Sequence, residues 1–431
     1  MMAASILAKL NQWTLERMTL LNREILARRM APEILVVELN RDVLPLLPAT
    51  ATCTAAMSRQ LIVNLGLWGS SVGRHFQERD PQLKSRPHIP LQGLDVADTG
   101  YTAYMEKLAG PAAPGHPPRD TYASLVRWNT PDATVRWSGG ERVLAGCFDD
   151  GQVRTYTGDG GEVEFFVLLK KCEVIEKAIN ELVEPLCRGD LDVAAPEALE
   201  KMRQAVELLT LLHQVNLDFA HHPQPRALQP AHFMDVMRQF AVHWAVGGVP
   251  PSGAQDVEFL VRDALLGIDF PGYVEHVRRI FPSLLACERD RFIELASGPT
   301  LPDVALSHLG VRPADLSAMN HDSLLEVARR HPVLAACYLV IATNSRVSAA
   351  HLMLTKKYLF KPQRKRDDEG LPDGVVVSNR AGTTGMLELL LESLHRARMR
   401  HPLVMFDQLS NKVLRQIAGV VHTQPKVVCA T

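Results

Sequence analysis

The histidine best placed for chemistry is His351, in the segment NSRVSAAHLMLTKKYLF (344–360). The segment is predicted to be helical, and the small residues Ser348, Ala349 and Ala350 precede the histidine, which leaves room for a flat ligand to approach its ring. A neutral imidazole nitrogen presented in this way can hold a haem iron as its single protein ligand. The alternative is a histidine hydrogen-bonded inside a helical core, and a chain with 16 histidines leaves both interpretations open.

A second candidate lies in HFMDVMRQFAVHWAVGG (232–248), where apolar residues recur at helical spacing at Phe233, Met237, Phe240 and Trp244. Apolar side chains at this spacing usually face a core. Arg238 interrupts the apolar stretch, and an arginine in such a setting needs an anionic partner. That partner is either a carboxylate of the protein or a carboxylate of a ligand.

Two compact loops of glycine and threonine follow, Gly247-Gly248 and AGTTG (381–385). Such loops either border a ligand or simply end helices. The sequence contains no P-loop, no GxGxxG after a strand, no HExxH, no GxSxG and no EF-hand loop. The seven cysteines form no CxxC pair, which predicts free thiols in a reducing compartment.

The composition supplies a large framework for these candidates. A chain of 431 residues allows two or three domains, and 46% hydrophobic with 22% charged residues is typical of a globular protein. The 47 basic and 48 acidic residues give a net charge of −1, which argues against a nucleic-acid partner. No run approaches the roughly 18 apolar residues of a membrane span, and no targeting segment stands out. We therefore expect a cytoplasmic protein that binds neither nucleic acid nor membrane.

The apolar pattern becomes strongly helical from residue 163. Apolar residues fall three and four positions apart along Phe165, Leu168, Cys172, Ile175, Ile179, Leu182 and Leu186. Further helices are predicted at 7–27, 51–67, 197–217, 231–244, 255–267, 271–297, 303–309, 321–330, 332–360 and 384–399.

Two other segments punctuate this helical pattern. Residues 133–157 alternate loosely around glycine turns, which predicts one or two β-hairpins, and TGDGG (157–161) predicts a linker. KPQRKRDDEG (361–370) mixes both charge signs, which predicts a solvated loop. We therefore predict a mainly α protein with a small mixed N-terminal domain (1–158) and a large helical-bundle domain (159–431).

Taken in order, a series of segments resembles the indoleamine 2,3-dioxygenase superfamily of haem proteins, closest to its monodechloroaminopyrrolnitrin synthase branch. The resemblance extends from about residue 100 to 400 and implies that the large domain binds haem b. The matching segments are PPRDTYASLVRWNTP (117–131), GGEVEFFVLLKKCEVIEKAI (160–179), HFMDVMR (232–238), AVGGVPPSGAQDVEFLVRDALLG (245–267), YVEHVRRIFPSLLACERDRFIE (273–294), AAHLMLTKKYL (349–359) and AGTTGMLELLLESL (381–394).

On the haem side, the resemblance places His351 at the proximal iron ligand and Gly247 with Gly248 against the haem edge. Many dioxygenases carry an arginine three residues before this histidine, and here that position is Ser348. Arg346, five residues before, matches the synthase branch instead. The resemblance therefore implies that Arg346 pairs with the haem propionates.

On the substrate side, the resemblance implies a carboxylate clamp at Arg238 with Phe233 beside the substrate, and both residues are assigned to catalysis. Leu169 falls where mammalian-type dioxygenases carry a distal serine, so the pocket is more apolar here and simple dioxygenase behaviour is less expected. The full set of implied substrate-binding residues is Tyr122, Phe165, Leu169, Phe233, Arg238, Thr383 and Thr384.

The activity that the resemblance implies is haem-dependent oxidation of a tryptophan or tryptophan-derived indole substrate with molecular oxygen. In the synthase branch this chemistry belongs to antibiotic biosynthesis and other secondary metabolism. Oxidative rearrangement and oxygen insertion are both consistent with the sequence. The alternatives are ring-opening 2,3-dioxygenation of tryptophan or indole, and a non-catalytic haem-binding sensor.

Overall fold

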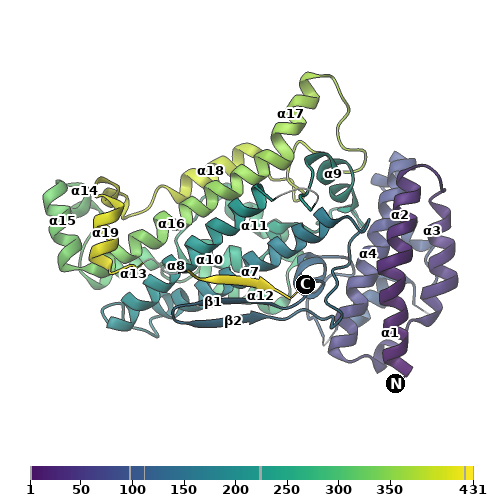
Figure 1. Cartoon of the computed structure of the whole chain (residues 1–431), viewed down its shortest axis with the longest axis horizontal. Coiled ribbons are helices and arrows are strands. Elements are labelled where there is room, and N and C mark those ends of the chain that lie inside the picture. Colours follow the sequence, from purple (N-terminus) through teal and green to yellow (C-terminus); the bar gives the residue numbers. More distant parts are fainter. Residues whose placement is uncertain (1, 97–98, 111, 223–225, 422–423, 431) are drawn as a thin grey trace.

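The computed structural model describes residues 2–96, 99–110, 112–222, 226–421 and 424–430. It is mainly helical, with 65% helix and 3% strand, which confirms the predicted fold class at that level. Figure 1 shows the N-terminal helices side by side at one end of the molecule, whereas the helices that follow residue 160 form the remainder.

The N-terminal helices pack around α4 (Ala55–Arg79). This helix begins at Thr54, whose hydroxyl accepts the backbone N–H of Met57 at 3.3 Å. A Cβ on Gly69 of α4 would lie 2.4 Å from the Trp244 ring, so glycine at this position lets the tryptophan pack directly against the helix. The neighbouring helices are α1 (Met2–Gln12), α2 (Thr19–Leu26), α3 (Glu33–Glu38), α5 (Ile89–Gln92) and α6 (Tyr101–Ala109), with a π-helical turn, η1 (Trp13–Met18), between the first two.

Three long helices form the centre of the larger part: α7 (Gly160–Arg188), α8 (Pro196–Ala220) and α16 (Pro332–Thr355). Asp159 caps α7 by accepting the N–H of Gly161 at 2.7 Å, and the helix ends at Gly189, which adopts the left-handed conformation that favours glycine (φ 79°). Among the described helices, only the run Pro332–Asp368 is long and apolar enough to cross a membrane. Because 83% of its most apolar window is buried, it has the character of a core helix.

Shorter helices surround this centre. The predicted helix at 231–244 is wrong beyond residue 235, because the backbone departs from helical geometry at Val236 (φ −117°, ψ −78°) and a short 3₁₀ helix, η7 (Met237–Phe240), follows. The predicted helix at 271–297 is divided in two. The short helices are α9 (Pro230–Asp235), α10 (Val257–Leu265), α11 (Pro271–Ile280), α12 (Ala286–Ala296), α13 (Leu301–His308), α14 (Pro313–Ser317), α15 (His321–Arg330), α18 (Glu388–Arg398) and α19 (Asn411–Ala418).

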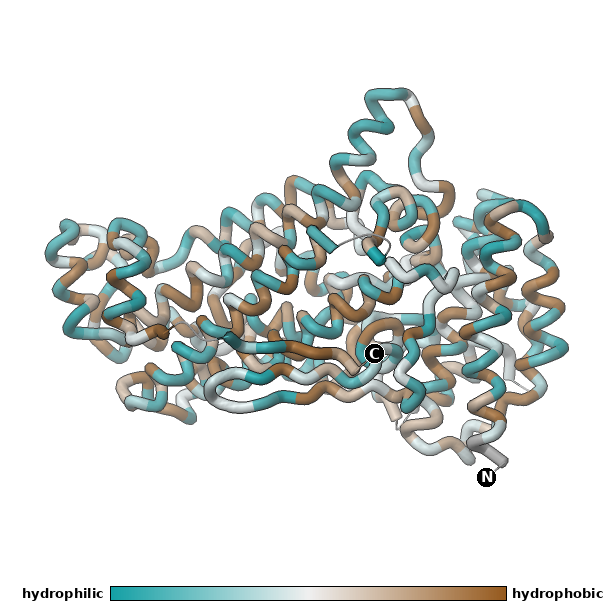
Figure 2. The backbone as a smooth tube through the Cα atoms, viewed as in Figure 1, coloured by the Kyte–Doolittle hydropathy of each residue, from teal (hydrophilic) through white to brown (hydrophobic). Residues whose placement is uncertain are grey.

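The charged segment 361–370 is not the predicted loop, because most of it forms helix α17 (Lys361–Asp368). This helix continues α16 through a π-helical turn, η10 (Lys356–Phe360), and projects from the molecule as a hydrophilic segment (Figure 2). Ion pairs hold it to its neighbours, because Arg366 contacts Asp235 at 2.5 Å and Arg380 contacts Asp367 at 2.7 Å.

A small antiparallel sheet lies against α7. The predicted hairpin is present as β1 (Ala133–Trp137) and β2 (Gly140–Leu144). A third strand, β3 (Lys426–Cys429), pairs with the other edge of β1, so that Ala133 lies between Leu144 and Cys429. The sequence analysis did not predict β3. The sheet thus joins residues from both predicted domains, and the division at residue 158 stays a prediction.

The buried apolar residues form two main cores. One contains β1 and the helices from α7 onward, and the other contains the N-terminal helices together with parts of residues 148–168 and 219–244. Phe166, Tyr122, Tyr156 and Met237 belong to the second core, and they also line the cavity described next.

Candidate functional site

A small cavity, here called the central cavity, lies where the first half of α7 meets the segments around residues 122, 238 and 252. Its volume is about 90 Å³. The wall is mostly aromatic and aliphatic, and Arg238 is the only charged side chain among the described residues that line it. The lining consists of Tyr122, Leu125, Val126, Tyr156, Phe165, Phe166, Leu169, Phe233, Met237, Arg238, Ala241, Pro251, Ser252, Gly253 and Thr383.

Six of the seven predicted substrate-binding residues line this one cavity, and Thr384 is the exception. The six come from separate segments of the chain, and the fold brings them together. Tyr122 precedes a π-helical turn, η6 (Ala123–Trp128), Phe165 and Leu169 lie one turn apart on α7, and Phe233 is on α9. The common location supports a single binding pocket.

Arg238 is buried in the cavity wall, with 4% of its surface exposed. Its Nη1 donates hydrogen bonds to the Ser378 carbonyl oxygen and to Asn379 Oδ1 (2.8 Å), and its Nη2 donates to the Ala381 carbonyl oxygen. Within the described ranges no carboxylate forms an ion pair with it. Burial lowers the pKa of Arg238 to about 10, although the more distant Asp373 opposes this shift. A buried cation held only by neutral acceptors is well suited to take a ligand carboxylate.

The aromatic wall connects the central cavity to the helix that carries His351. The rings of Phe165 and Phe233 have centroids 5.5 Å apart, and Phe233 meets Tyr358 at 6.2 Å. Tyr358 lies about two turns beyond His351 on the same helical run. Phe165 and Phe233 are partly exposed, which is typical of side chains that face a ligand space as well as a core.

Behind this wall, Tyr122 is linked to a buried carboxyl group. The Tyr122 hydroxyl lies 3.1 Å from Asp256 Oδ2 and 3.3 Å from the Leu169 carbonyl oxygen, either of which accepts its proton. Asp256 also hydrogen-bonds Glu176, which is paired with Arg262 at 2.5 Å. Burial, followed by Glu176 and Glu173, raises the pKa of Asp256 well above its usual range. The raised pKa favours the protonated form of Asp256, which donates its hydrogen bond to Glu176.

The AGTTG loop forms another side of the cavity. Thr383 faces the cavity, whereas the Thr384 hydroxyl hydrogen-bonds His276 of α11 at 3.3 Å. Gly385 adopts a left-handed conformation (φ 79°), and the Gly382 N–H donates to the Met386 carbonyl oxygen at 2.8 Å. The loop therefore places one threonine at the ligand space and uses the other to attach itself to α11.

His351 lies in the last third of α16, as predicted, and its ring is accessible to solvent. Burial, followed by the charges of Arg398 and Arg262, nevertheless lowers its pKa to about 4. His351 is not among the residues that line the central cavity. It contacts the Phe259 ring at 6.2 Å, and neither ring nitrogen hydrogen-bonds a residue in the described part of the chain. The imidazole is thus neutral and free to coordinate.

Ser348 lies one turn before His351 and does not face an open space. Its hydroxyl accepts a hydrogen bond from Arg398 Nη1 at 2.7 Å, and Arg398 is paired with Asp263 at 2.5 Å. Because Arg398 is also the largest charge acting on His351, Ser348 helps to hold a cation beside the imidazole. Tyr273 donates a further hydrogen bond to Asp263 at 2.9 Å.

Three predicted cofactor residues are not brought to this place. Arg346 lies about 140° around the helix axis from His351, because an α-helix turns about 100° per residue, and it lines a different cavity. Gly247 and Gly248 form an exposed turn beside Arg119, and the ligand space is lined instead by Pro251, Ser252 and Gly253.

Sequence reasoning missed Asp256 and Tyr156. Asp256 also caps α10, because its Oδ1 accepts the Glu258 N–H at 2.9 Å, and an aspartate just before a helix is normally explained by capping alone. The rings of Tyr156 and Phe240 are stacked with their centroids 4.2 Å apart. Tyr156 comes from the irregular segment after the hairpin, where no periodicity marks a functional position.

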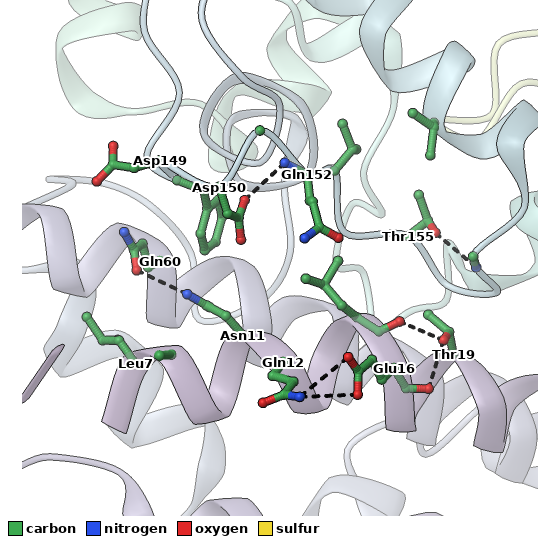
Figure 3. A pocket seen from close by; sticks show the side chains of 17 residues that line it. Leu7, Asn11, Gln12, Glu16, Thr19, Gln60, Asp149, Asp150, Gln152 and Thr155 are labelled. Carbon is green, nitrogen blue, oxygen red and sulfur yellow. Dashed lines mark hydrogen bonds between the residues drawn. The ribbon is translucent and has the colours of Figure 1, made fainter. Parts of the chain in front are cut away.

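A larger hollow lies elsewhere, between α1–η1 and residues 148–158, with a volume of about 960 Å³ (Figure 3). Its polar side chains mostly bind one another. Gln12 donates to Glu16 at 3.4 Å, and Asp150 accepts the Gln152 N–H at 3.0 Å. The central cavity contains a buried arginine that has no carboxylate partner, and among the described residues no such cation lines this cleft. We therefore assign the function to the central cavity.

Among the described residues, no group of three or more His, Cys, Asp or Glu side chains is placed to hold a metal ion. A haem iron needs only one protein ligand, so this finding does not bear on His351. Neither a protein-family model nor a curated protein matches this chain.

Proposed function

We propose that this protein is a haem b oxidoreductase that oxidises tryptophan or a tryptophan-derived indole amino acid with molecular oxygen. The observation that carries the proposal is the buried, carboxylate-free guanidinium of Arg238 at the edge of an aromatic cavity. An indole ring fits the chemistry of the aromatic wall, and a carboxylate fits the arginine. Oxidative rearrangement and oxygen insertion, as parts of secondary metabolism, are both compatible with this arrangement.

His351 is the residue that would hold the haem iron. Its ring is neutral, accessible and without a hydrogen-bond partner, and these are the properties of an imidazole available for coordination. The Ser348–Arg398–Asp263 network supplies charge and rigidity beside it. When bound, the haem would supply oxygen activation, which no side chain in the central cavity provides.

Arg238 would orient the substrate. A ligand carboxylate would accept the N–H groups that Arg238 now donates to the carbonyl oxygens of Ser378 and Ala381. A cavity of about 90 Å³ is smaller than a whole indole amino acid, so binding requires the 378–383 segment to shift. Charge-assisted hydrogen bonds in the enlarged pocket would replace weaker bonds to neutral carbonyls.

The other lining residues would exclude water and hold a proton near the ring. Phe165, Phe233 and Leu169 present apolar surface, and Tyr122 presents a hydroxyl. Asp256 stands behind that hydroxyl as a neutral acid, so the Tyr122–Asp256 pair is a proton source beside a mostly apolar cavity. The sequence analysis identified no such group.

The test begins with the absorption spectrum of the protein purified after haem supply. We expect a Soret band that shifts on reduction and again with carbon monoxide. His351→Ala should lose haem or change this spectrum, and His321→Ala is a matched control because that histidine is exposed at the start of α15. A wild-type protein without a Soret band, or an unchanged spectrum in His351→Ala, would refute the haem assignment.

The substrate part is tested by titrating haem-loaded protein with tryptophan and with halogenated tryptophans. We expect each to perturb the Soret band, and mass spectrometry of the products to show oxidation of the indole compound. If haem binds but no indole amino acid changes the spectrum or is oxidised, the substrate assignment is wrong while the haem assignment stands.

A further inference from the structure

A second cavity lies on the opposite side of α16 from His351, between α16, the end of α18 and the segment that leads into α19. Its volume is about 380 Å³, which is in the range of small-molecule sites. The polar lining residues are Tyr338, Ser345, Arg346, His395, His401, Asp407 and Asn411, and the remainder are Ala342, Ala349 and Met399.

The cation in this cavity is unpaired. Arg346 makes no hydrogen bond or ion pair with any residue in the described ranges, and its side chain is exposed to the cavity. A second guanidinium, that of Arg415, is close enough that the charge of Arg346 lowers the pKa of Arg415 after the effect of burial. Two neighbouring guanidinium groups repel one another unless an anion lies between them.

The single carboxylate of the cavity does not neutralise this pair. Asp407 accepts a hydrogen bond from the Tyr338 hydroxyl at 2.5 Å, and it forms no ion pair within 4 Å with either arginine. The charge of Asp407 acts on Tyr338 and His401 instead. The cationic side of the cavity therefore has no counter-charge of its own.

Neutral donors surround the same space. Asn411 Oδ1 accepts the Arg415 Nε hydrogen at 3.0 Å, which leaves the amide N–H₂ of Asn411 free to donate. The rings of His395 and His401 line the cavity, and the Nδ1 atom of each is buried without a partner. Atoms this deeply buried cannot meet a ligand in the cavity, so any hydrogen bond from either ring to a ligand must come from its Nε2 atom.

We propose that this cavity binds a small oxyanion, a phosphate or carboxylate group, with Arg346 as its main ligand and Asn411 and His401 as further donors. The planar fork of arginine suits both groups, because two parallel N–H bonds meet two oxygens. The site is separate from the central cavity, and the proposal does not depend on haem or on an indole substrate.

The experiment measures binding of inorganic phosphate and of succinate to the full-length protein by calorimetry and thermal shift, with sodium chloride at matched ionic strength as the salt control. We expect at least one of the two oxyanions to bind and to raise Tm, whereas chloride does not. Arg346→Met should weaken that binding at least about tenfold, the effect of losing a charged hydrogen bond of roughly 1.5 kcal/mol. Arg329→Met, which removes an exposed arginine of α15 outside the cavity, should bind like the wild type.

Two further measurements keep the result interpretable. Without oxyanion, Arg346→Met should be at least as stable as the wild type, because it relieves the repulsion with Arg415. If that variant does not fold, Arg346→Lys serves instead. Lysine lacks the planar guanidinium group, so this substitution should still weaken binding of the oxyanion. Phosphate binding without succinate binding would identify a phosphate group, and the reverse a carboxylate group. Equal effects of chloride and both oxyanions, or unchanged binding in the Arg346 variants, would overturn the proposal.

Discussion

Replacing Asp256 with asparagine tests the neutral acid behind Tyr122. In the folded protein burial and the neighbouring Glu176 and Glu173 raise the pKa of this carboxyl group well above its usual range, which favours the protonated form. In the unfolded chain it titrates near ~4. Between these two values the folded state binds about one more proton than the unfolded state. The free energy of unfolding of the wild type therefore falls as pH rises, by up to about 1.4 kcal/mol per pH unit from this group.

Asp256→Asn removes this dependence and keeps the local hydrogen bonds. Its carbonyl oxygen can still accept the Glu258 N–H, and its amide can donate to Glu176 as the protonated acid does. The free energy of unfolding of the variant minus that of the wild type should therefore increase as pH rises from about 5 towards the pKa of Asp256 in the folded protein. The slope should approach about 1.4 kcal/mol per pH unit.

Denaturant unfolding at pH 5.5, 6.5 and 7.5 measures this difference directly. Asp190→Asn is the control, since it makes the same change of charge at an exposed position after α7 and should show no pH trend. A difference between Asp256→Asn and wild type that stays constant, or that shrinks with rising pH, would show that Asp256 is ionised in the folded protein. The proton source assigned to the pocket wall would then be absent.

Other predictions concern the cavity, its supports and a buried lysine. Arg238→Gln keeps hydrogen-bond donors for the carbonyl oxygens of residues 378–381. It should weaken binding of tryptophan about tenfold to a hundredfold and change tryptamine binding little, because only tryptophan carries the carboxylate. Equal losses for both ligands would reject the role of Arg238 as a carboxylate clamp. Gly69→Ala should destabilise the protein by about 1–3 kcal/mol and alter Trp244 fluorescence, because the added methyl group meets the ring, whereas Gly160→Ala has open space and should be nearly neutral. Lys170 donates to the Ala145 carbonyl oxygen at 2.9 Å, and burial lowers its pKa to about 8. Since the unfolded chain binds the proton up to about pH 10, wild-type stability should rise between pH 8 and 10 in unfolding experiments, and Lys170→Met should lack this rise.

Long amphipathic helices could be predicted from sequence because their signal extends over many turns. The stripe from Phe165 to Leu186 and the long apolar run around His351 correspond to α7 and α16. Short elements with tertiary causes could not be predicted. β3 has four residues and pairs with a strand almost 300 residues away, so no local turn indicates it. The charged α17 has no apolar stripe, and distant ion pairs such as Arg366–Asp235 support it.

The candidate site divides in the same way. Residue type was enough to select Arg238, because an arginine in an apolar stretch raises the question of its partner. The order of segments that resemble the dioxygenase superfamily pointed to Tyr122, Phe165, Leu169 and Phe233 as substrate-binding residues. The fold brings these four residues to one cavity. Arg346 lies on a different face of α16 from His351, because five residues correspond to about 140° around the helix axis. Its pairing with haem propionates stays a prediction. The role of Asp256 at the site was not predicted, because its position just before α10 is explained by helix capping alone.

The pairing of β3 with β1 has a consequence for synthesis of the chain. Residues 133–137 leave the ribosome long before residues 426–429, so one edge of β1 has unsatisfied N–H and C=O groups until residues 426–429 have been synthesised. During that interval the hairpin is open to pairing with another nascent chain. A deletion of residues 426–430 would make this exposure permanent, and the truncated protein should aggregate at expression levels that the full-length chain tolerates.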